Sequence, residues 1–342
     1  MGFIASGNAV LATPDLAADQ RFRALAGVES RIRAVLAVPL TAGGRVTGCL
    51  AVSEVRPGRQ WTDRDVELLN MVAQRSGDVI ERARMREERD RNQEAHRAAE
   101  SAAKVMDHVR QLQASFLPSQ PLLVAGWEAC GQVIPARHVG GDLFDYFRTG
   151  DGSVGLAVAD VEGKGLVAGY IMALVKGSLI EIGRARLPAA EALAHVNRVV
   201  ANIRPLKTVT MFYGEFDFHA GILRYSSAGH PPPLVRRRDG RVDLLEEGGC
   251  LFGALAEADY PQCETALGAG DALLLYSDGV TEALDASHSI FGEERLRAVW
   301  SEAGGGPPEE AMGRVLRAVE GFRGAAPQSD DITLVVMGRP SR

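Results

Sequence analysis

Four aspartates that border apolar runs are the residues of this chain best placed to do chemistry. They are Asp142, Asp160, Asp278 and Asp330, and glycine lies close to the first three. A carboxylate beside glycine at a strand end sits where the backbone turns tightly and can carry it into a cleft. We therefore expect the four side chains to meet at one site.

Converging carboxylates need a cation to offset their repulsion. Oxygen donors without a histidine or cysteine partner favour Mn²⁺ or Mg²⁺ over zinc. A pair of such ions can activate water for attack on phosphorus and screen the charge of the phosphate. No Gly-x-x-x-x-Gly-Lys-Ser/Thr loop is present, which argues against an NTPase. Each motif alone is an ordinary turn or strand entry, so the prediction rests on the ordered set of four.

Composition limits the classes of protein to consider. With 342 residues and 46% hydrophobic content, the chain is long enough for two domains and a connector. A net charge of −6 provides no basic surface for binding nucleic acid or an anionic membrane. The one basic run, Arg236–Arg238, is expected on a solvated loop. The four cysteines are widely spaced, and charges interrupt every apolar run. We expect a soluble cytoplasmic protein that binds neither nucleic acid nor membrane.

The first 84 residues read as a hairpin followed by a helix. Runs 34–40 and 45–53 are β-rich and flank Gly43 and Gly44. Thr62 can cap the helix that follows, with Asp65 as its reciprocal partner.

Residues 81–116 are highly charged and contain no glycine or proline, which predicts a helix that ends before Pro118. Its apolar residues recur in steps of three and four, and the pattern fits either a parallel coiled-coil dimer or one amphipathic helix lying on a neighbouring domain. We favour the dimer. The seam consists of Ala95, Ala98, Ala102, Val105, Val109, Leu112 and Phe116.

The region 127–338 groups β-like runs around strongly helical stretches, which predicts an α+β sandwich. The predicted strands are 154–161, 209–218, 221–227, 272–276 and 332–337, and the predicted helices are 166–184, 189–203, 293–303 and 309–320.

From about residue 112 to 337 the chain resembles the metal-dependent protein phosphatase (PPM) family, in its bacterial SpoIIE/RsbU-type branch. The matching motifs occur in family order at family-like spacing. They are Leu112-Gln113-x-x-Phe116-Leu117-Pro118, Val139-Gly140-Gly141-Asp142, Ala159-Asp160-Val161-x-Gly163-Lys164-Gly165, Thr210-Met211-Phe212-Tyr213-Gly214, Ser227-Ala228-Gly229-His230-Pro231-Pro232, Tyr276-Ser277-Asp278-Gly279 and Asp330-Asp331-Ile332-Thr333.

The resemblance implies a PPM-type αββα sandwich and assigns roles to the motif residues. Asp160 would bridge two metal ions, with the main-chain carbonyl of Val161 adding an oxygen. Asp278 and Asp330 would hold the second ion, and Asp142 would act through water. Asp331 is a further candidate ligand, with Asp330 preferred within that pair.

Four other residues have both a functional and a structural explanation. Arg137 lies where animal members keep a phosphate-binding arginine, or is a surface residue. His230 is a candidate general acid, but its position between Gly229 and Pro231 favours a structural role in a turn. Lys164 either faces the phosphate or belongs structurally to the start of the next helix. Asp145 is either a site residue or a solvated turn residue.

The stretch 21–84 resembles the second half of a GAF domain, a small-molecule or light-sensing module. Only about 84 residues precede the linker, so this looks like a partial GAF-like α/β domain to which we assign no ligand residue. Cys49 lies within a predicted strand, which favours a buried thiol over a chromophore attachment site. The expected division is 1–84 sensory domain, 85–121 helical linker and 122–342 phosphatase domain.

The resulting hypothesis is a signalling enzyme in which the linker sets phosphatase activity, by shifting helix 166–184 and so moving Asp160 relative to Asp278. By resemblance, the substrate would be a phosphorylated anti-anti-sigma (STAS-type) regulator in a partner-switching pathway. The alternative is a non-catalytic scaffold of the same fold that acts through its GAF-like domain and coiled coil. A full set of acidic residues argues against that alternative.

Overall fold

The computed structural model describes residues 9–21, 31–42, 45–56, 58–137, 139–150, 152–163, 165–203 and 207–339. The chain divides into two compact units, Met1–Ala102 and Ala103–Arg342. Gly43 and Gly44 of the predicted turn and Lys164 lie outside the described residues.

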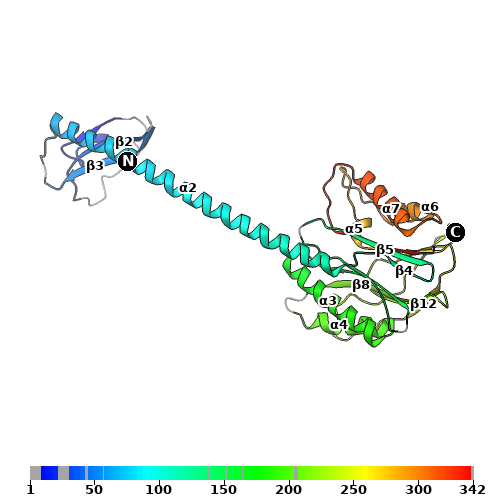
Figure 1. The fold of residues 1–342 in the computed structure, drawn as a ribbon. Helices are drawn as coiled ribbons and strands as arrows, with labels where there is room; N and C mark the ends of the chain where they lie inside the picture. Colours follow the sequence, from blue (N-terminus) through cyan, green and yellow to red (C-terminus); the bar gives the residue numbers. More distant parts are fainter. Residues whose placement is uncertain are drawn as a thin grey trace. The chain divides into compact units, whose positions relative to one another are not determined.

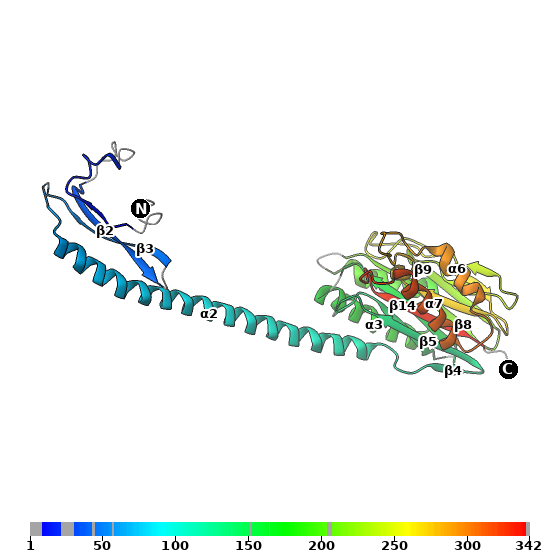
Figure 2. The same ribbon diagram turned by 90° about the horizontal axis from the view of Figure 1, so that it is seen from above.

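The first unit is built on a three-stranded antiparallel sheet in the order β1-β2-β3. The strands are β1 (Leu11–Thr13), β2 (Ala34–Ala42) and β3 (Arg45–Glu54), so the predicted hairpin is confirmed. The β2–β3 hairpin lies along the first turns of helix α2 (Asp63–Phe116), as Figure 2 shows. Gly77 marks the close approach, because a side chain there would collide with the Thr41 carbonyl.

Helix α2 begins as the sequence predicts and is longer than predicted. The Thr62 N–H donates to Asp65 Oδ2 at 2.8 Å, and the Asp65 N–H donates to Thr62 Oγ1 at 3.3 Å. The predicted capping pair is therefore present. The two helical stretches recognised separately in the sequence form one helix of 54 residues, because no glycine or proline interrupts hydrogen bonding between residues 78 and 116.

In the second unit, two antiparallel sheets lie between two pairs of helices (Figure 1). One sheet has the order β12-β9-β8-β7-β6 and the other β11-β10-β13-β14-β5-β4. This αββα arrangement is the predicted sandwich. The strands are β4 (Leu122–Val124), β5 (Trp127–Ile134), β6 (Leu143–Arg148), β7 (Val154–Val161), β8 (Val209–Asp217), β9 (Ile222–Ala228), β10 (Leu234–Arg236), β11 (Val242–Leu244), β12 (Cys263–Ala266), β13 (Ala272–Tyr276) and β14 (Ile332–Gly338).

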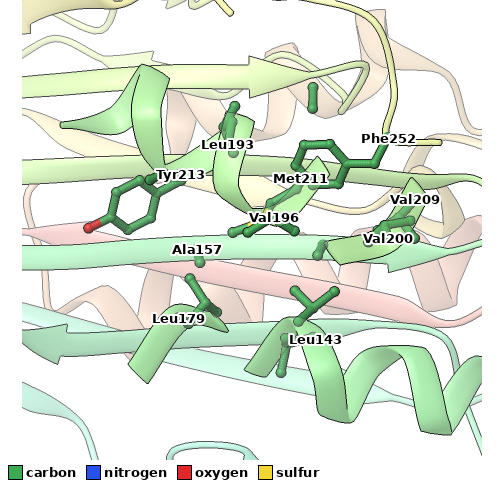
Figure 3. Close-up of a cluster of buried hydrophobic side chains, with 14 of the residues drawn as sticks. Leu143, Ala157, Leu179, Leu193, Val196, Val200, Val209, Met211, Tyr213 and Phe252 are labelled. Atoms are coloured by element: carbon green, nitrogen blue, oxygen red, sulfur yellow. The ribbon is translucent and has the colours of Figure 1, made fainter. Parts of the chain in front are cut away.

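The helices of this unit are α3 (Leu166–Ala185), α4 (Ala189–Ala201), the short α5 (Asp278–Thr281), α6 (Glu293–Glu302) and α7 (Pro308–Arg323). Helices α3 and α4 cover the β7–β8 face, where side chains such as Leu179, Val196 and Met211 interlock (Figure 3). A second cluster fills the space between the sheets, and a third joins the β13–β14 face to α6 and α7. These three apolar layers fix the strand ends that carry the aspartates.

Two expectations from the sequence need correction. We expected charges to interrupt every apolar run, but helix α3 is long and apolar enough to cross a membrane by length and composition. Its buried side chains, among them Ile171 and Val175, pack in the apolar core against the five-stranded sheet. The solvated-loop expectation for Arg236–Arg238 holds only for Arg238, which is exposed in a turn. Arg236 ends β10 and is 5% exposed, and Arg237 is half-buried and pairs with Asp243 at 2.7 Å. Strand β10 lies between β11 and β13 in the six-stranded sheet, so Arg236 is flanked by a strand on either side.

Candidate active site

One cavity of about 280 Å³ collects three of the four predicted aspartates, from both sheets. Asp160 comes from the end of β7, Asp278 begins α5 directly after β13, and Asp330 precedes β14. The two sheets thus deliver carboxylates to one space from opposite sides. The cavity is lined by Asp160, Val161, Glu162, Gly163, Thr208, Thr210, Asp278, Asp330 and Asp331.

Asp160 is held in an environment that disfavours its negative charge. Burial, and then the neighbouring charge of Asp278, raise the pKa of Asp160 to about 6. Asp330 and Asp331 act in the same direction more weakly. A carboxylate in such surroundings is stabilised by any cation that enters the cavity.

Asp142 lies behind Asp160, buried at 3% exposure. Its Oδ2 accepts a hydrogen bond from the Thr333 hydroxyl, and burial together with the charge of Asp160 raises the pKa of Asp142. The structure therefore gives Asp142 no direct place on the cavity wall. This position agrees with the indirect role that the resemblance implies.

Asp331 serves the backbone with both of its carboxylate oxygens. Oδ1 accepts from the Ala136 N–H at 2.7 Å, and Oδ2 accepts from the Gly141 N–H at 2.8 Å. The Asp331 N–H in turn donates to Asp330 Oδ1 at 2.8 Å. This arrangement favours Asp330 over Asp331 as the ligand of the pair, because two main-chain donors already occupy Asp331.

Close backbone packing explains the glycines of the motifs. A side chain at Gly141 would collide with the Val161 carbonyl, and one at Gly279 would collide with the Asp331 carbonyl. The first contact holds the loop before β6 against the end of β7, and the second holds the start of α5 against Asp331, just before β14. These glycines therefore allow two backbone segments to pack closely, in addition to any role in turn geometry.

The residues that line the cavity offer oxygen donors suited to divalent cations. Within the described ranges, no group of three or more His, Cys, Asp or Glu side chains is already arranged to hold a metal ion. The side-chain donors are nevertheless all oxygens around this cavity of about 280 Å³, and several are carboxylates. Mg²⁺ keeps several waters and takes only one or two protein carboxylates, so this donor set fits hard cations.

Other predicted residues lie away from the cavity. Arg137 is exposed and is not among the cavity-lining residues. Asp145 is neither a solvated turn residue nor a site residue: it lies in β6, 5% exposed, and its Oδ2 is 2.6 Å from Lys176 Nζ. The solvated-turn interpretation of Asp145 is wrong, because the β6 side chain points under α3.

His230 is structural in this arrangement. It is 6% exposed, and its Nδ1 lies 2.9 Å from Thr210 Oγ1. Burial lowers the pKa of His230 to about 3, so the ring is neutral at physiological pH. It supports Thr210, which lines the cavity, and does not line the cavity itself.

Several residues of the site carry no individual signal in the sequence. Thr210 pairs with Asp160 in the β7–β8 register, which brings its hydroxyl to the cavity. Glu162 accepts from the Thr208 hydroxyl at 2.6 Å and thereby closes the rim. Only strand pairing reveals these neighbours, although Thr210 and Glu162 both fall within or beside the quoted motifs.

Comparisons with known proteins agree with this geometry. A family model described as Stage II sporulation protein E (SpoIIE) matches residues 150–340, more than half of the 342 residues, and a GAF domain model matches residues 2–80. The phosphoserine phosphatase RsbU of Bacillus subtilis is 32% identical over 151 residues, covering 44% of this chain and 45% of the relative. Protein IcfG of Synechocystis is 26% identical over 258 residues, covering 67% and 40%.

Two solved structures share the fold. The SiaA-PP2C domain of Pseudomonas aeruginosa has a TM-score of 0.62 at 21% identity, covering 71% of this chain and 99% of that chain. The RsbU and RsbW domains of a Mycobacterium tuberculosis protein have a TM-score of 0.53 at 26% identity, covering 65% of each chain. The chain spans less than half the length of the two curated relatives described above.

Proposed function

The chain belongs to the SpoIIE family, a bacterial branch of the PPM-type phosphatases with a GAF domain at its N-terminal side, and we propose that it is a protein serine/threonine phosphatase. The single observation that carries the proposal is the convergence of Asp160, Asp278 and Asp330 on one cavity. Three acidic residues from two sheets have no structural reason to share a solvent-accessible space, since burial and repulsion both oppose it.

We propose that the cavity takes two divalent cations, Mn²⁺ or Mg²⁺. Asp160 and the Val161 carbonyl would hold them on the β7 side, and Asp278 and Asp330 on the other. When bound, such ions lower the pKa of a coordinated water and screen the charge on a phosphate. No phosphoenzyme is needed, because water attacks phosphorus directly.

The chain's own groups supply orientation around this centre. Asp142 and the Thr333 hydroxyl support Asp160 from behind, and Asp331 fixes the loop that carries Asp142 through two main-chain hydrogen bonds. Thr210, backed by His230, places a hydroxyl at the cavity wall. Arg137 remains a proposed phosphate-binding residue, since an exposed guanidinium beside the loop could meet the phosphate of a bound protein.

The proposed substrate is a phosphoserine or phosphothreonine on a STAS-type anti-anti-sigma protein, in partner-switching signalling in the cytoplasm. The relatives RsbU and RsbP are both phosphoserine phosphatases by name, which supports the phosphoserine assignment. We further propose a sensory domain at 1–84, a linker at 85–121 that dimerises through its apolar seam, and a phosphatase domain at 122–342. Val105 and Leu112 of the seam are exposed in the single chain, as a dimer seam requires.

The test is hydrolysis of p-nitrophenyl phosphate and of a phosphorylated STAS protein by the full chain, with and without Mn²⁺. Asp160→Asn should abolish the Mn²⁺-dependent rate, whereas the exposed turn variant Asp239→Asn should retain it. Activity without metal, or full activity in Asp160→Asn, would reject the phosphatase. An inactive wild type that still binds partner protein would favour the scaffold.

A further inference from the structure

Gln113, in the last turn of α2, bonds to both main-chain polar groups of one residue, Gly140, in the loop before β6. Its Nε2 donates to the Gly140 carbonyl at 2.7 Å, and its Oε1 accepts from the Gly140 N–H at 3.2 Å. The two bonds fix the orientation of the amide, since a flipped amide would place oxygen against oxygen. Nε2 also lies 2.8 Å from Met172 Sδ of α3.

Gly140, held in this way, directly precedes residues that support the site. The next residue, Gly141, donates to Asp331 Oδ2 at 2.8 Å and accepts from the Val161 N–H at 3.3 Å. Asp142 follows immediately and supports Asp160. Loop 139–142 is therefore bounded by Asp331, by the end of β7 and by Gln113.

Gln113 also joins the two elements that frame the cavity. Loop 139–142 supports the acidic residues, and α3, which carries Met172, starts three residues after the lining residue Gly163. Phe116 and Leu117 pack on the same apolar cluster as Met172. A rotation or shift of the end of α2 would break the bonds to Gly140 before it disturbed this packing, since hydrogen bonds tolerate less misalignment than apolar contacts.

We propose that Gln113 is a positioning residue that couples the end of α2 to the acidic loop, so that cation binding depends on the placement of that helix. This inference rests on the proposed phosphatase function and deepens it, because it names the contact through which the linker reaches the site. Gln113 touches neither substrate nor ions in this role. It acts through the Gly140 peptide.

The test uses the full chain with Gln113→Ala and Gln113→Glu, and Gln111→Ala as the matched control. Gln111 lies on the same helix and reaches only the exposed Asp107. Gln113→Glu keeps an acceptor for the Gly140 N–H and loses the donor to the carbonyl. Three readouts are compared: the Mn²⁺ concentration for half-maximal rate, the Mn²⁺-induced rise in melting temperature without substrate, and hydrogen exchange of the amides of residues 139–142.

Both Gln113 variants should need about tenfold more Mn²⁺ for half-maximal rate, because losing these hydrogen bonds loosens the loop. Their loop amides should exchange faster, and kcat at saturating Mn²⁺ should fall much less than the apparent affinity. Wild-type Mn²⁺ dependence or wild-type loop exchange in both variants overturns the proposal. If the wild type has no Mn²⁺-dependent activity, the phosphatase function fails, while loop exchange and the melting shift still decide the role of Gln113.

Discussion

Lys176 Nζ of α3 lies 2.6 Å from Asp145 Oδ2 of β6, in an ion pair that the surrounding apolar side chains nearly enclose. The Lys176 side chain is 19% exposed and that of Asp145 7%. Burial raises the pKa of Asp145, and the hydrogen bond and charge of Lys176 oppose that rise. The pair fastens the middle of α3 to β6, at the edge of the five-stranded sheet.

Replacing one member of this pair should destabilise the second unit. Asp145→Asn leaves the Lys176 ammonium uncompensated, and we expect a loss of about 3 kcal/mol of unfolding free energy. Urea unfolding measures this loss. The double variant Asp145→Leu/Lys176→Met should recover most of it, because no charge then remains buried. Because Asp145 does not line the cavity, Asp145→Asn should keep the wild-type Mn²⁺ dependence, and a large increase in required Mn²⁺ would place Asp145 in the site after all.

Asp160→Asn should have opposite effects on stability with and without metal. In EDTA the variant should be about 1 kcal/mol more stable than the wild type, because one buried charge facing Asp278 is removed. In saturating Mn²⁺ the order should reverse, since only the wild type gains from binding, by about 2.7 kcal/mol at 100 times the Kd. Melting curves in both buffers test this, and Asp239→Asn should follow the wild type in each. A variant less stable in EDTA would show that Asp160 is needed for folding rather than for cations.

His230 should make the second unit less stable below pH 6.5. Burial holds the pKa of the folded ring at about 3, whereas the pKa of the ring in the unfolded chain lies near its ordinary value of 6.5. Between these values the unfolded state binds the proton and the folded state does not, so stability falls by up to about 1.4 kcal/mol per pH unit as pH decreases. His230→Asn, which can keep the bond to Thr210, should show a shallower decrease between pH 6.5 and 5. Parallel curves for the two proteins would contradict the neutral buried ring.

In the described part of the second unit the apolar patterns predicted the four longer helices and five strands, but they missed β4, β5, β6, β10, β11 and β12. The contacts between elements could not be read from these patterns. Strand 272–276 and the start of helix 166–184 appear where the sequence placed them, because apolar periodicity reports local burial. Asp145 is buried because it pairs with Lys176, 31 residues away in the sequence. Arg236 is buried in a strand that lies between two others in the six-stranded sheet. Neither neighbour is visible in a single sequence. The four aspartates could be predicted because glycine and apolar flanks mark strand ends, whereas Thr210 and Gln113 act through register and tertiary contact.

The linker seam should control association. In the triple variant Val105→Glu, Val109→Glu and Leu112→Glu, charges occupy the apolar positions of the proposed dimer, so the full chain should change from dimer to monomer. Light scattering after size-exclusion chromatography measures the mass, and Gln111→Glu serves as a control with one added charge off the seam. If linker pairing sets activity, turnover should change as well. Unchanged mass and unchanged turnover together would exclude both the dimer and its coupling to the site.

Gly279→Ala should damage the site through the backbone rather than through charge. The added Cβ would collide with the Asp331 carbonyl, and relief requires either α5 or the start of β14 to move. Either movement separates Asp278 from Asp330, so we expect Mn²⁺-dependent activity to fall at least about tenfold and stability to fall by about 2 kcal/mol. Gly321→Ala is the matched control, since nothing lies within 4 Å of an added Cβ there and alanine favours the interior of α7. That control should be as active as the wild type and slightly more stable. Full activity in Gly279→Ala would mean that the spacing of these two aspartates does not limit catalysis.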